Sequence, residues 1–457
     1  MIEVARLGFA AIALAGCASV STTDSAAHIS QPISTQLAVA TFDSLWSKVA
    51  QTYVDTAFVS SEWKAVRDSL RPRAMQITER DDLEALLARA LKHIPDSHFY
   101  LIPARVATDE SSAGESDGRG RTGLLVRLAE GNVVAWRVEP GTPAMIAGFV
   151  PGQQVTKVGS KDVAVSLKRV RALPVEAQQR ALADLLHSLN GALTPAVGDT
   201  VKVWSSKAER KSVEYSLVGV PGVGKLSQFG NLPPIAGLVK ATKVPAGPGK
   251  CVGVIAFNIW LPELGPDLEQ AVDSVRSCEG IIVDLRGNPG GVGAMVMGFG
   301  GYFVTSTSSL GTMKTRLVSL NFVINPRGSR ANGTSIAPYA GPLAIVVDPM
   351  TARTSEIFAT GMQRLGRARV FGERSAGAAL PALMERLPSE DVFVHAVADF
   401  TDPTGKRVEG AGVVPDELVP LTLADLRSGR DAPVDAAVKW IGTSSGSGSV
   451  PAADARH

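Results

Sequence analysis

The sequence predicts an α/β domain built on a mostly parallel sheet, preceded by a small helical domain and a small β domain. Apolar residues recur at helical spacing within 38–105, short β-type runs follow within 121–218, and strand and helix patterns alternate within 250–425. The chain has 457 residues, a length that favours about three domains.

Composition and charge indicate a globular protein and argue against a nucleic-acid-binding function. Hydrophobic residues make up 45% of the chain and charged residues 20%, values typical of a globular protein with a packed core. The 46 basic side chains are balanced by 44 acidic ones, which leaves a net charge of +2. Because so balanced a charge does not favour a polyanionic partner, we expect no binding to nucleic acid.

Residues 1–17 form a short apolar segment that predicts an export signal and is too short to span a membrane. Its end, Leu14-Ala-Gly-Cys17, resembles the lipobox of bacterial lipoproteins, in which the cysteine is lipidated and becomes the new N-terminus. This resemblance implies a lipid anchor in the bacterial cell envelope, facing the periplasm, and Ala18-Ser19 favours the outer membrane. A plain secretory signal is the alternative. Residues 18–37, rich in Ser, Thr and Ala, predict a flexible tether.

The helical domain is predicted over 38–105. Its periodic apolar residues are Phe42, Leu45, Trp46, Val49, Tyr53, Trp63, Val66, Leu70, Leu83, Leu86, Leu87, Ala90 and Leu91. The polar stretch 106–120 predicts a loop.

The β domain, predicted over 121–218, contains a turn that resembles the PDZ pattern, Pro140-Gly-Thr-Pro-Ala-Met-Ile-Ala-Gly148. In that resemblance Gly123, Leu124 and Leu125 form the carboxylate-binding loop, whose backbone N–H groups hold a peptide C-terminus while the peptide adds as a strand. An insertion at about 165–195 departs from the PDZ pattern. A generic small β domain is the alternative.

The α/β domain is predicted over 250–425, and a Gly/Ser-rich disordered tail over 441–457. Its expected strands cover 252–257, 280–285, 343–347 and 368–371, and its expected helices cover 267–275 and 355–365.

Two strands in this domain end in motifs that could bind a ligand or hold a nucleophile. The strand ending at Asp284 breaks into a turn in which Arg286 can brace Asp284, while Gly290 and Gly291 allow close backbone approach to a ligand. The turn lacks the Lys-Ser/Thr of a phosphate loop. A second strand runs into Thr351-Ala-Arg-Thr-Ser-Glu356 at a helix start, where a nucleophile would gain from the helix dipole.

Together with Gly366-Arg-Ala-Arg-Val-Phe-Gly-Glu373, these motifs resemble the C-terminal processing, or tail-specific, serine peptidase family. The resemblance implies a mixed-sheet core of the ClpP/crotonase-like kind with a helical N-terminal domain and a PDZ-like domain. It also implies a serine-type peptidase that acts on polypeptide C-termini. No cofactor and no metal are expected, since no Cys/His cluster has ligand spacing.

The family has two catalytic solutions, and the sequence favours the one similar to the tricorn protease core. Ala378 stands at the position of the catalytic lysine, which excludes a Ser/Lys dyad. The resemblance implies His98 as general base, supported by Ser97 and Glu409. It also implies an oxyanion hole, formed by Gly290 or Gly291 together with the N–H of Thr354. The other candidate bases, His93 and His395, have no motif behind them.

Arg353 departs from the family pattern, because it stands where the nucleophilic serine is expected. Arginine stays protonated and cannot attack a carbonyl. Three interpretations remain open: an inactive, lipid-anchored peptide-binding relative, an active lineage with a substitution, or attack by Ser355. A shift of two helical residues rotates a side chain by about 200°, which disfavours Ser355. We expect Arg353 to pair with Glu409 or to stay solvated, and peptidase activity to be absent or very low.

If Cys17 is lipidated, Cys251 and Cys278 remain as an even pair in an oxidising compartment. They flank a predicted strand and helix that return the chain to the same sheet edge, which favours a disulfide. Two unrelated small core residues are the alternative.

Overall fold

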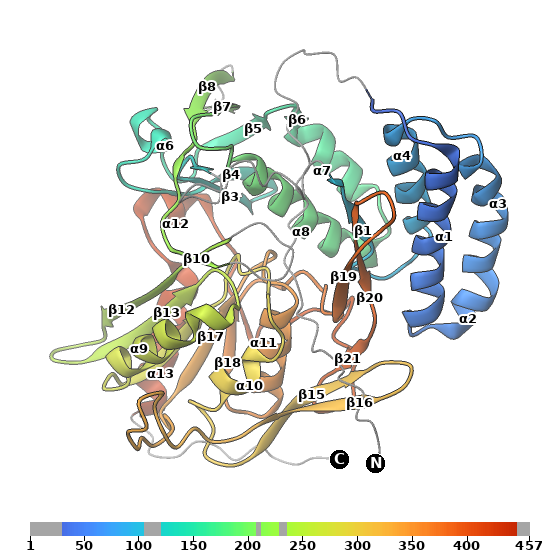
Figure 1. Ribbon diagram of the computed structural model, residues 1–457. Helices are drawn as coiled ribbons and strands as arrows, with labels where there is room; N and C mark the ends of the chain where they lie inside the picture. Colours follow the sequence, from blue (N-terminus) through green and yellow to red (C-terminus); the bar gives the residue numbers. More distant parts are fainter. Residues whose placement is uncertain (1–29, 105–119, 207–211, 228–234, 446–457) are drawn as a thin grey trace, which may run out of the picture.

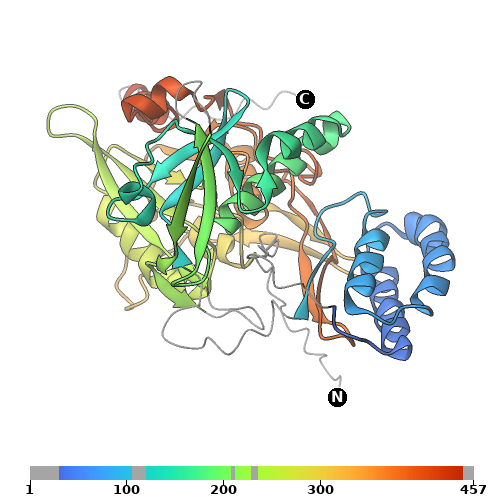
Figure 2. The same ribbon diagram turned by 90° about the horizontal axis from the view of Figure 1, so that it is seen from above.

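The computed structural model describes residues 30–104, 120–206, 212–227 and 235–445. Figure 1 shows three parts in chain order: a helical domain, a β domain above the centre of the molecule, and a larger α/β core below it. Figure 2 shows that the helical domain lies to one side, while the β domain lies against the core. Cys17 and most of the predicted tether lie outside the described residues.

The helical domain is held by a continuous apolar core that includes Phe42, Leu45, Trp63 and Leu87. The side chain of Ser34 accepts a hydrogen bond from the N–H of Leu37 and so caps the first helix. Its helices are α1 (Thr35–Thr52), α2 (Thr56–Phe58), the π-helical turn η1 (Val59–Trp63), α3 (Lys64–Ala74) and α4 (Arg80–Leu91). Since α1 begins at Thr35, residues 35–37 are helical, although the sequence pattern assigned them to the tether.

The chain then leaves the helical domain through β1 (Tyr100–Ile102), which pairs with a strand of the core. Residues 100–102, expected within the helical domain, therefore belong to a three-stranded sheet. In the described part of the chain, no helix is long and apolar enough to cross a membrane.

The β domain contains one antiparallel sheet, with strand order β3-β4-β5-β7-β8 and with β6 paired to β5. β3 lies at an edge of this sheet, and the long helix α8 packs against it. Its elements are β2 (Gly120–Arg121), β3 (Leu124–Ala129), β4 (Asn132–Val138), α6 (Pro143–Ile146), β5 (Gln154–Val158), β6 (Lys161–Asp162), α7 (Val163–Arg171), α8 (Val175–Ala192), β7 (Thr200–Ser206), β8 (Val213–Val218) and β9 (Val220–Pro221). The predicted insertion is thus α7 and α8.

The core sheet has the order β12-β13-β14-β17-β18-β22, with every neighbouring pair parallel except β12 and β13. The chain reaches it through the short pair β10 (Lys225–Ser227) and β11 (Ile235–Gly237). Its strands are β12 (Val239–Pro245), β13 (Cys251–Phe257), β14 (Gly280–Asp284), β17 (Leu343–Val347), β18 (Arg369–Gly372) and β22 (Glu417–Leu418). The four predicted strands of the sheet are present to within one or two residues.

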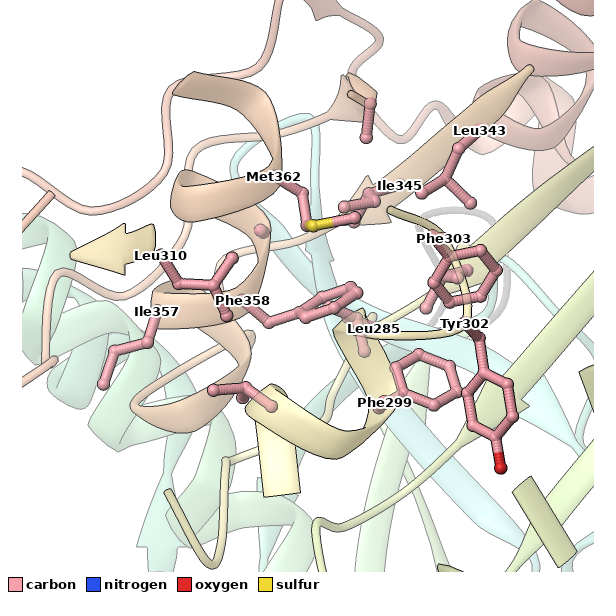
Figure 3. Close-up of a cluster of buried hydrophobic side chains, with 14 of the residues drawn as sticks. Leu285, Phe299, Tyr302, Phe303, Leu310, Leu343, Ile345, Ile357, Phe358 and Met362 are labelled. Carbon is pink, nitrogen blue, oxygen red and sulfur yellow. The ribbon is translucent and has the colours of Figure 1, made fainter. Parts of the chain in front are cut away.

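Both faces of the core sheet are covered, as expected for apolar parallel strands. One face packs under α9 (Gly265–Val275), α10 (Met295–Gly300) and α11 (Thr354–Arg364), which follow the short 3₁₀ turn η3 (Pro262–Leu264). Figure 3 shows the cluster on this face, in which Phe358 and Met362 lie near Ile345 and Leu285. The other face packs against α13 (Ala432–Ser445). Residues 441–445 are therefore helical, although the sequence pattern placed them in a disordered tail.

Several strands beside the core sheet were not predicted. They are β15 (Ser308–Lys314), β16 (Ser319–Ile324), β19 (Ala382–Arg386), β20 (Val392–Ala396) and β21 (Asp399–Thr401), and the short helix α12 (Leu423–Ser428) follows them. β20 pairs with β1, so this sheet joins the core to the segment that follows α4.

Cys251 and Cys278 are joined by a disulfide. Cys251 begins β13 and Cys278 follows α9, so the bond closes the crossover expected from the sequence.

Candidate functional site

The site lies where loops from distant parts of the chain meet at the carboxyl ends of the parallel strands β14, β17 and β18. The turn after β14 contributes Gly290 and Gly291, and the loop after β17 leads into α11 through Arg353. The segment after α4 brings His98 to this edge of the sheet. Ligand sites of parallel sheets typically form at such an edge.

Arg353 has a backbone conformation that arginine rarely adopts, with φ 57° and ψ −120°. Such a conformation costs about 1–3 kcal/mol and persists only where the surroundings hold it. Its N–H donates to the carbonyl of Ala378 at 3.0 Å and to Oε2 of Glu356 at 3.1 Å. The chain thus bends sharply at Arg353 and directs this side chain away from α11.

The side chain of Arg353 contacts the predicted general base directly. Its Nε lies 2.6 Å from Nε2 of His98, and its Nη1 donates to the carbonyl of Pro289 at 3.1 Å. Because the guanidinium only donates, Nε2 of His98 accepts, and the ring proton is on Nδ1. Nδ1 lies 2.5 Å from Oγ of Ser97.

Burial lowers the pKa of His98 well below its ordinary value, and the charges of Arg353 and Arg180 lower it further. His98 is 5% exposed. The imidazole is therefore neutral, which agrees with its role as acceptor from Arg353.

Glu409 supports Ser97 rather than Arg353. Its Oε1 accepts from the N–H of Ser97 at 2.9 Å, and its Oε2 accepts from the N–H of Ala379 at 2.7 Å. The cation beside it is Arg180, whose Nη1 lies 3.6 Å from Oε1. The expected Arg353–Glu409 pair is therefore wrong, because Arg353 turns to His98 and Arg180 occupies the place beside the carboxylate.

Ser355 does not lie in the site. It is fully buried on the first turn of α11, and its Oγ accepts a hydrogen bond from Nε1 of Trp260 at 2.8 Å. The rotation of two helical residues directs this hydroxyl into the core, away from His98. This geometry contradicts the interpretation of Ser355 as nucleophile.

The backbone N–H groups predicted to form the oxyanion hole differ in whether they are already hydrogen-bonded. The N–H of Gly290 donates to Oδ1 of Asn288 at 3.0 Å. Among the described residues, the N–H groups of Gly291 and Thr354 have no acceptor. A Cβ on Gly290, which has a φ of +103°, would lie 2.6 Å from Cβ of Arg353 and 3.0 Å from the nitrogen of Thr354. Glycine at 290 therefore allows the turn after β14 to pack directly against the backbone at Arg353 and Thr354, where any side chain would clash.

Charged and polar groups brace the two loops behind the site. Arg286 pairs with Asp284 at 2.7 Å and with Asp431 at 2.8 Å. Glu356 accepts from Oγ of Ser375 and from the N–H of Gly377 at 2.7 Å. Burial raises the pKa of Glu356 to about 7.

Helix α8 of the β domain lies against the site, a contact that sequence patterns did not reveal. Gln179 donates to the carbonyls of Arg374 and Ser375 at 2.7 and 3.1 Å, and Arg180 reaches Glu409. Ala183 packs on Ala352, Ala376 and Ala378. The run of Ala, Leu and Arg within 165–195 was the only sign of this helix in the sequence.

The same helix occupies the edge of β3. Oδ1 of Asn190 accepts from the N–H of Val126 at 2.9 Å, and its Nδ2 donates to the carbonyl of Val126 at 3.0 Å. These are the backbone groups that an added strand would use. Gly123, with φ 77°, and Leu124 precede this point, so the predicted peptide-binding segment leads into a strand edge that a side chain already pairs.

The rival histidines lie elsewhere. His93 is exposed just after α4, and His395 on β20 hydrogen-bonds Oε2 of Glu385 at 2.6 Å. Among the described residues, no group of three His, Cys, Asp or Glu side chains is arranged to hold a metal ion.

Comparisons with known proteins agree with the fold of the core and of the helical domain. Residues 252–419 match Peptidase family S41, and residues 40–92 match the Tricorn protease C1 domain. A carboxyl-terminal-processing protease of Picosynechococcus is 23% identical over 82% of this chain and 81% of its own length. Carboxyl-terminal-processing peptidase 3 of Arabidopsis thaliana, a chloroplast protein, is 20% identical over 81% of this chain and 67% of its own length.

Solved structures show the same fold. The photosystem II D1 C-terminal processing protease aligns with a TM-score of 0.55 and 20% identity, covering 89% of this chain and 97% of its own. Mature CPAF aligns with a TM-score of 0.58 and 11% identity, covering 91% and 99%. The domain that carries Arg353 and Glu409 thus matches peptidase family S41, and the chain is similar to carboxyl-terminal-processing proteases over most of its length.

Proposed function

We propose that this chain binds polypeptides without hydrolysing them. One observation carries the proposal: Arg353 stands at the nucleophile position and donates to Nε2 of His98 at 2.6 Å. A serine peptidase needs a hydroxyl at this place, whose proton the base removes. Here the lone pair of the base is already bonded to a cation that has no nucleophilic electron pair.

The rest of the arrangement supports binding rather than loss of the site. The strained bend at Arg353, the Ser97–His98 pair, Glu409 and the unpaired N–H groups of Gly291 and Thr354 are all present. A backbone held in such a conformation is costly, so its presence argues that the site still serves a ligand.

The competing hypothesis is serine-type peptidase activity on protein C-termini, as the names of the relatives indicate for those proteins. Its weakness is chemical, because Ser355 is buried against Trp260 and no other hydroxyl of the described chain bonds to Nε2 of His98. Labelling with a fluorophosphonate serine probe separates the two hypotheses. The non-hydrolysing protein stays unlabelled and gains labelling when Arg353 is changed to serine.

The β domain is proposed as a PDZ-like peptide-binding domain. Its edge strand β3 begins with Leu124 and Leu125 directly after Gly123, and strand addition at this edge would recognise an extended peptide. Because Asn190 pairs with Val126, such binding requires the helix α8 to withdraw from the edge.

The cellular location is proposed from the sequence alone. Leu14-Ala-Gly-Cys17 supports lipidation of Cys17 and attachment to a bacterial envelope membrane, with the protein facing the periplasm. The disulfide between Cys251 and Cys278 is consistent with an oxidising compartment.

A further inference from the structure

We propose that Arg353 converts the site into a carboxylate-binding site that takes the free C-terminal carboxylate of a bound polypeptide. This inference rests on the proposed function, since hydrolysis would remove the need for it. It differs from the PDZ-like expectation, which assigns the carboxylate to the segment at Gly123.

The site presents hydrogen-bond donors without matching acceptors. Nε and Nη1 of Arg353 are used by His98 and Pro289, whereas Nη2 has no acceptor within the described residues. The buried N–H groups of Gly291 and Thr354 also lack acceptors there. Buried backbone N–H groups without a partner are rare in proteins, so two of them beside a free guanidinium nitrogen indicate that an acceptor binds here.

The geometry gathers these donors at one place. Thr354 follows Arg353 directly, and the missing Cβ of Gly290 would lie within 3.0 Å of both Cβ of Arg353 and the nitrogen of Thr354. The turn after β14 and the start of α11 are therefore in direct contact, so an acceptor bound beside them can meet donors from both segments.

Arg353 forms no direct ion pair with a carboxylate among the described residues, and its side-chain partners are a neutral imidazole and a carbonyl. The nearest acidic influence is the buried Asp184 of α8: burial raises its pKa, and the charges of Arg353 and Arg180 lower it. Glu409 is held by Ser97, Ala379 and Arg180. A partly exposed cation beside unpaired N–H groups favours an anionic ligand.

A carboxylate matches the charge of these donors better than a phosphate dianion does. Arg353 supplies one positive charge and has no direct ion pair in the described part of the chain, so a ligand group with one negative charge matches it. Arginine and backbone N–H groups bind the two oxygens of a carboxylate through charge-assisted hydrogen bonds. In a protein that binds polypeptides, the chemical source of such a group is a free C-terminus.

The test measures binding of N-terminally fluorescent decapeptides of randomised sequence, prepared with either a free or an amidated C-terminus. The unmodified protein is expected to bind the free form at least tenfold more tightly, and Arg353→Gln is expected to abolish this preference. Arg353→Lys, which keeps the charge but not the planar fork, should retain part of it. Arg386→Gln, which removes a cation on β19, is the matched control and should keep the full preference.

Mass spectrometry of the same peptides after incubation distinguishes the two claims. Cleaved peptides would show that the proposed function fails. Intact peptides that bind equally well in both forms would overturn the carboxylate site alone. A free-carboxylate preference that survives in Arg353→Gln would also overturn it and assign the carboxylate to the segment at Gly123. Melting temperatures of all variants verify that each one is folded. If Arg353→Gln does not fold, Arg353→Lys takes its place in the test.

Discussion

Nε of Arg353 and Nε2 of His98, 255 residues apart in the sequence, lie 2.6 Å from each other. This contact fixes the protonation state of the imidazole, because a guanidinium donates and only a neutral ring nitrogen accepts. It also places a cation where a serine peptidase holds its nucleophile. Among the described residues, no hydroxyl bonds to Nε2 of His98, and the lone pair of this nitrogen that would take the proton is already occupied.

Asn190→Ala should free the edge of β3. Each hydrogen bond contributes about 1 kcal/mol net, so loss of both bonds to Val126 should accelerate exchange of the Val126 amide hydrogen roughly tenfold or more. Hydrogen exchange monitored by mass spectrometry or NMR measures this. Glu176→Ala, an exposed substitution on the same helix, should leave the exchange unchanged, and equal rates in both variants would contradict the role of Asn190.

Removal of the disulfide should destabilise the core. Cys251 and Cys278 are 27 residues apart, and closing a loop of this length contributes about 3–4 kcal/mol in the chain-entropy model. The double variant Cys251→Ala/Cys278→Ala should lose about this free energy of unfolding in urea. A loss below about 1 kcal/mol would show that the bond contributes little.

Protonation of His187 should destabilise the protein in mild acid. Glu356 and Glu373, whose pKa values burial raises to about 7, act in the opposite direction, so the effect of His187 has to be measured against a variant. Burial lowers the pKa of His187 to about 4, while the unfolded chain binds this proton near pH 6.5. Between these values the unfolded state carries the extra proton, so the contribution of His187 to the free energy of unfolding becomes less favourable as the pH drops from about 6.5 to about 4. The lowered pKa of His98 acts in the same direction.

Urea unfolding at a series of pH values measures this effect. His187 donates from Nε2 to the carbonyl of Met350 at 3.1 Å, and His187→Asn removes the titrating ring. As the pH falls from about 6.5 to about 4, the free energy of unfolding of the unmodified protein should decrease relative to that of the variant. Parallel curves for the two proteins would refute the assignment.

Cys17→Ser should release the protein from membranes, because the substitution removes the proposed acylation site. Membrane fractionation of cells that produce the variant measures the released share. If the variant stays entirely in the membrane fraction, the lipid-anchor proposal fails.

The sequence predicted the parts of the fold that depend on local patterns. The parallel strands β13, β14 and β17 are continuous apolar runs, and the helical domain has clear helical spacing. The strands β15 and β19 were missed because they contain few buried residues and derive their pairing from distant segments. The last turn of helix α13 was not predicted, because Gly442 and the serines after it have a composition typical of a disordered tail. The packing of this helix on the sheet depends on residues before them.

In the candidate site too, the sequence predicted the features that depend on local motifs and not those that depend on contacts between domains. Motifs named His98, Glu409 and Arg353 as members of one site, and hydrogen bonds through Ser97 link the three in the structure. Glu409 was named through the family motif alone, because the strand before it, β21, was not predicted. The partner of Arg353 was wrong, because the choice between His98 and Glu409 depends on where Arg180 of α8 docks. No local pattern in the sequence encodes that contact between domains.

Restoration of a serine at position 353 tests the central claim most directly. The unmodified protein, Arg353→Ser, and Arg353→Ser combined with His98→Ala are each treated with a fluorophosphonate probe, and the labelled residue is mapped by mass spectrometry. We expect no labelling of the unmodified protein and labelling at position 353 in the first variant. The labelling rate should fall by several orders of magnitude when His98 is also replaced. Labelling of the unmodified protein at Ser355, or an Arg353→Ser variant that folds and stays unlabelled, would contradict the central claim.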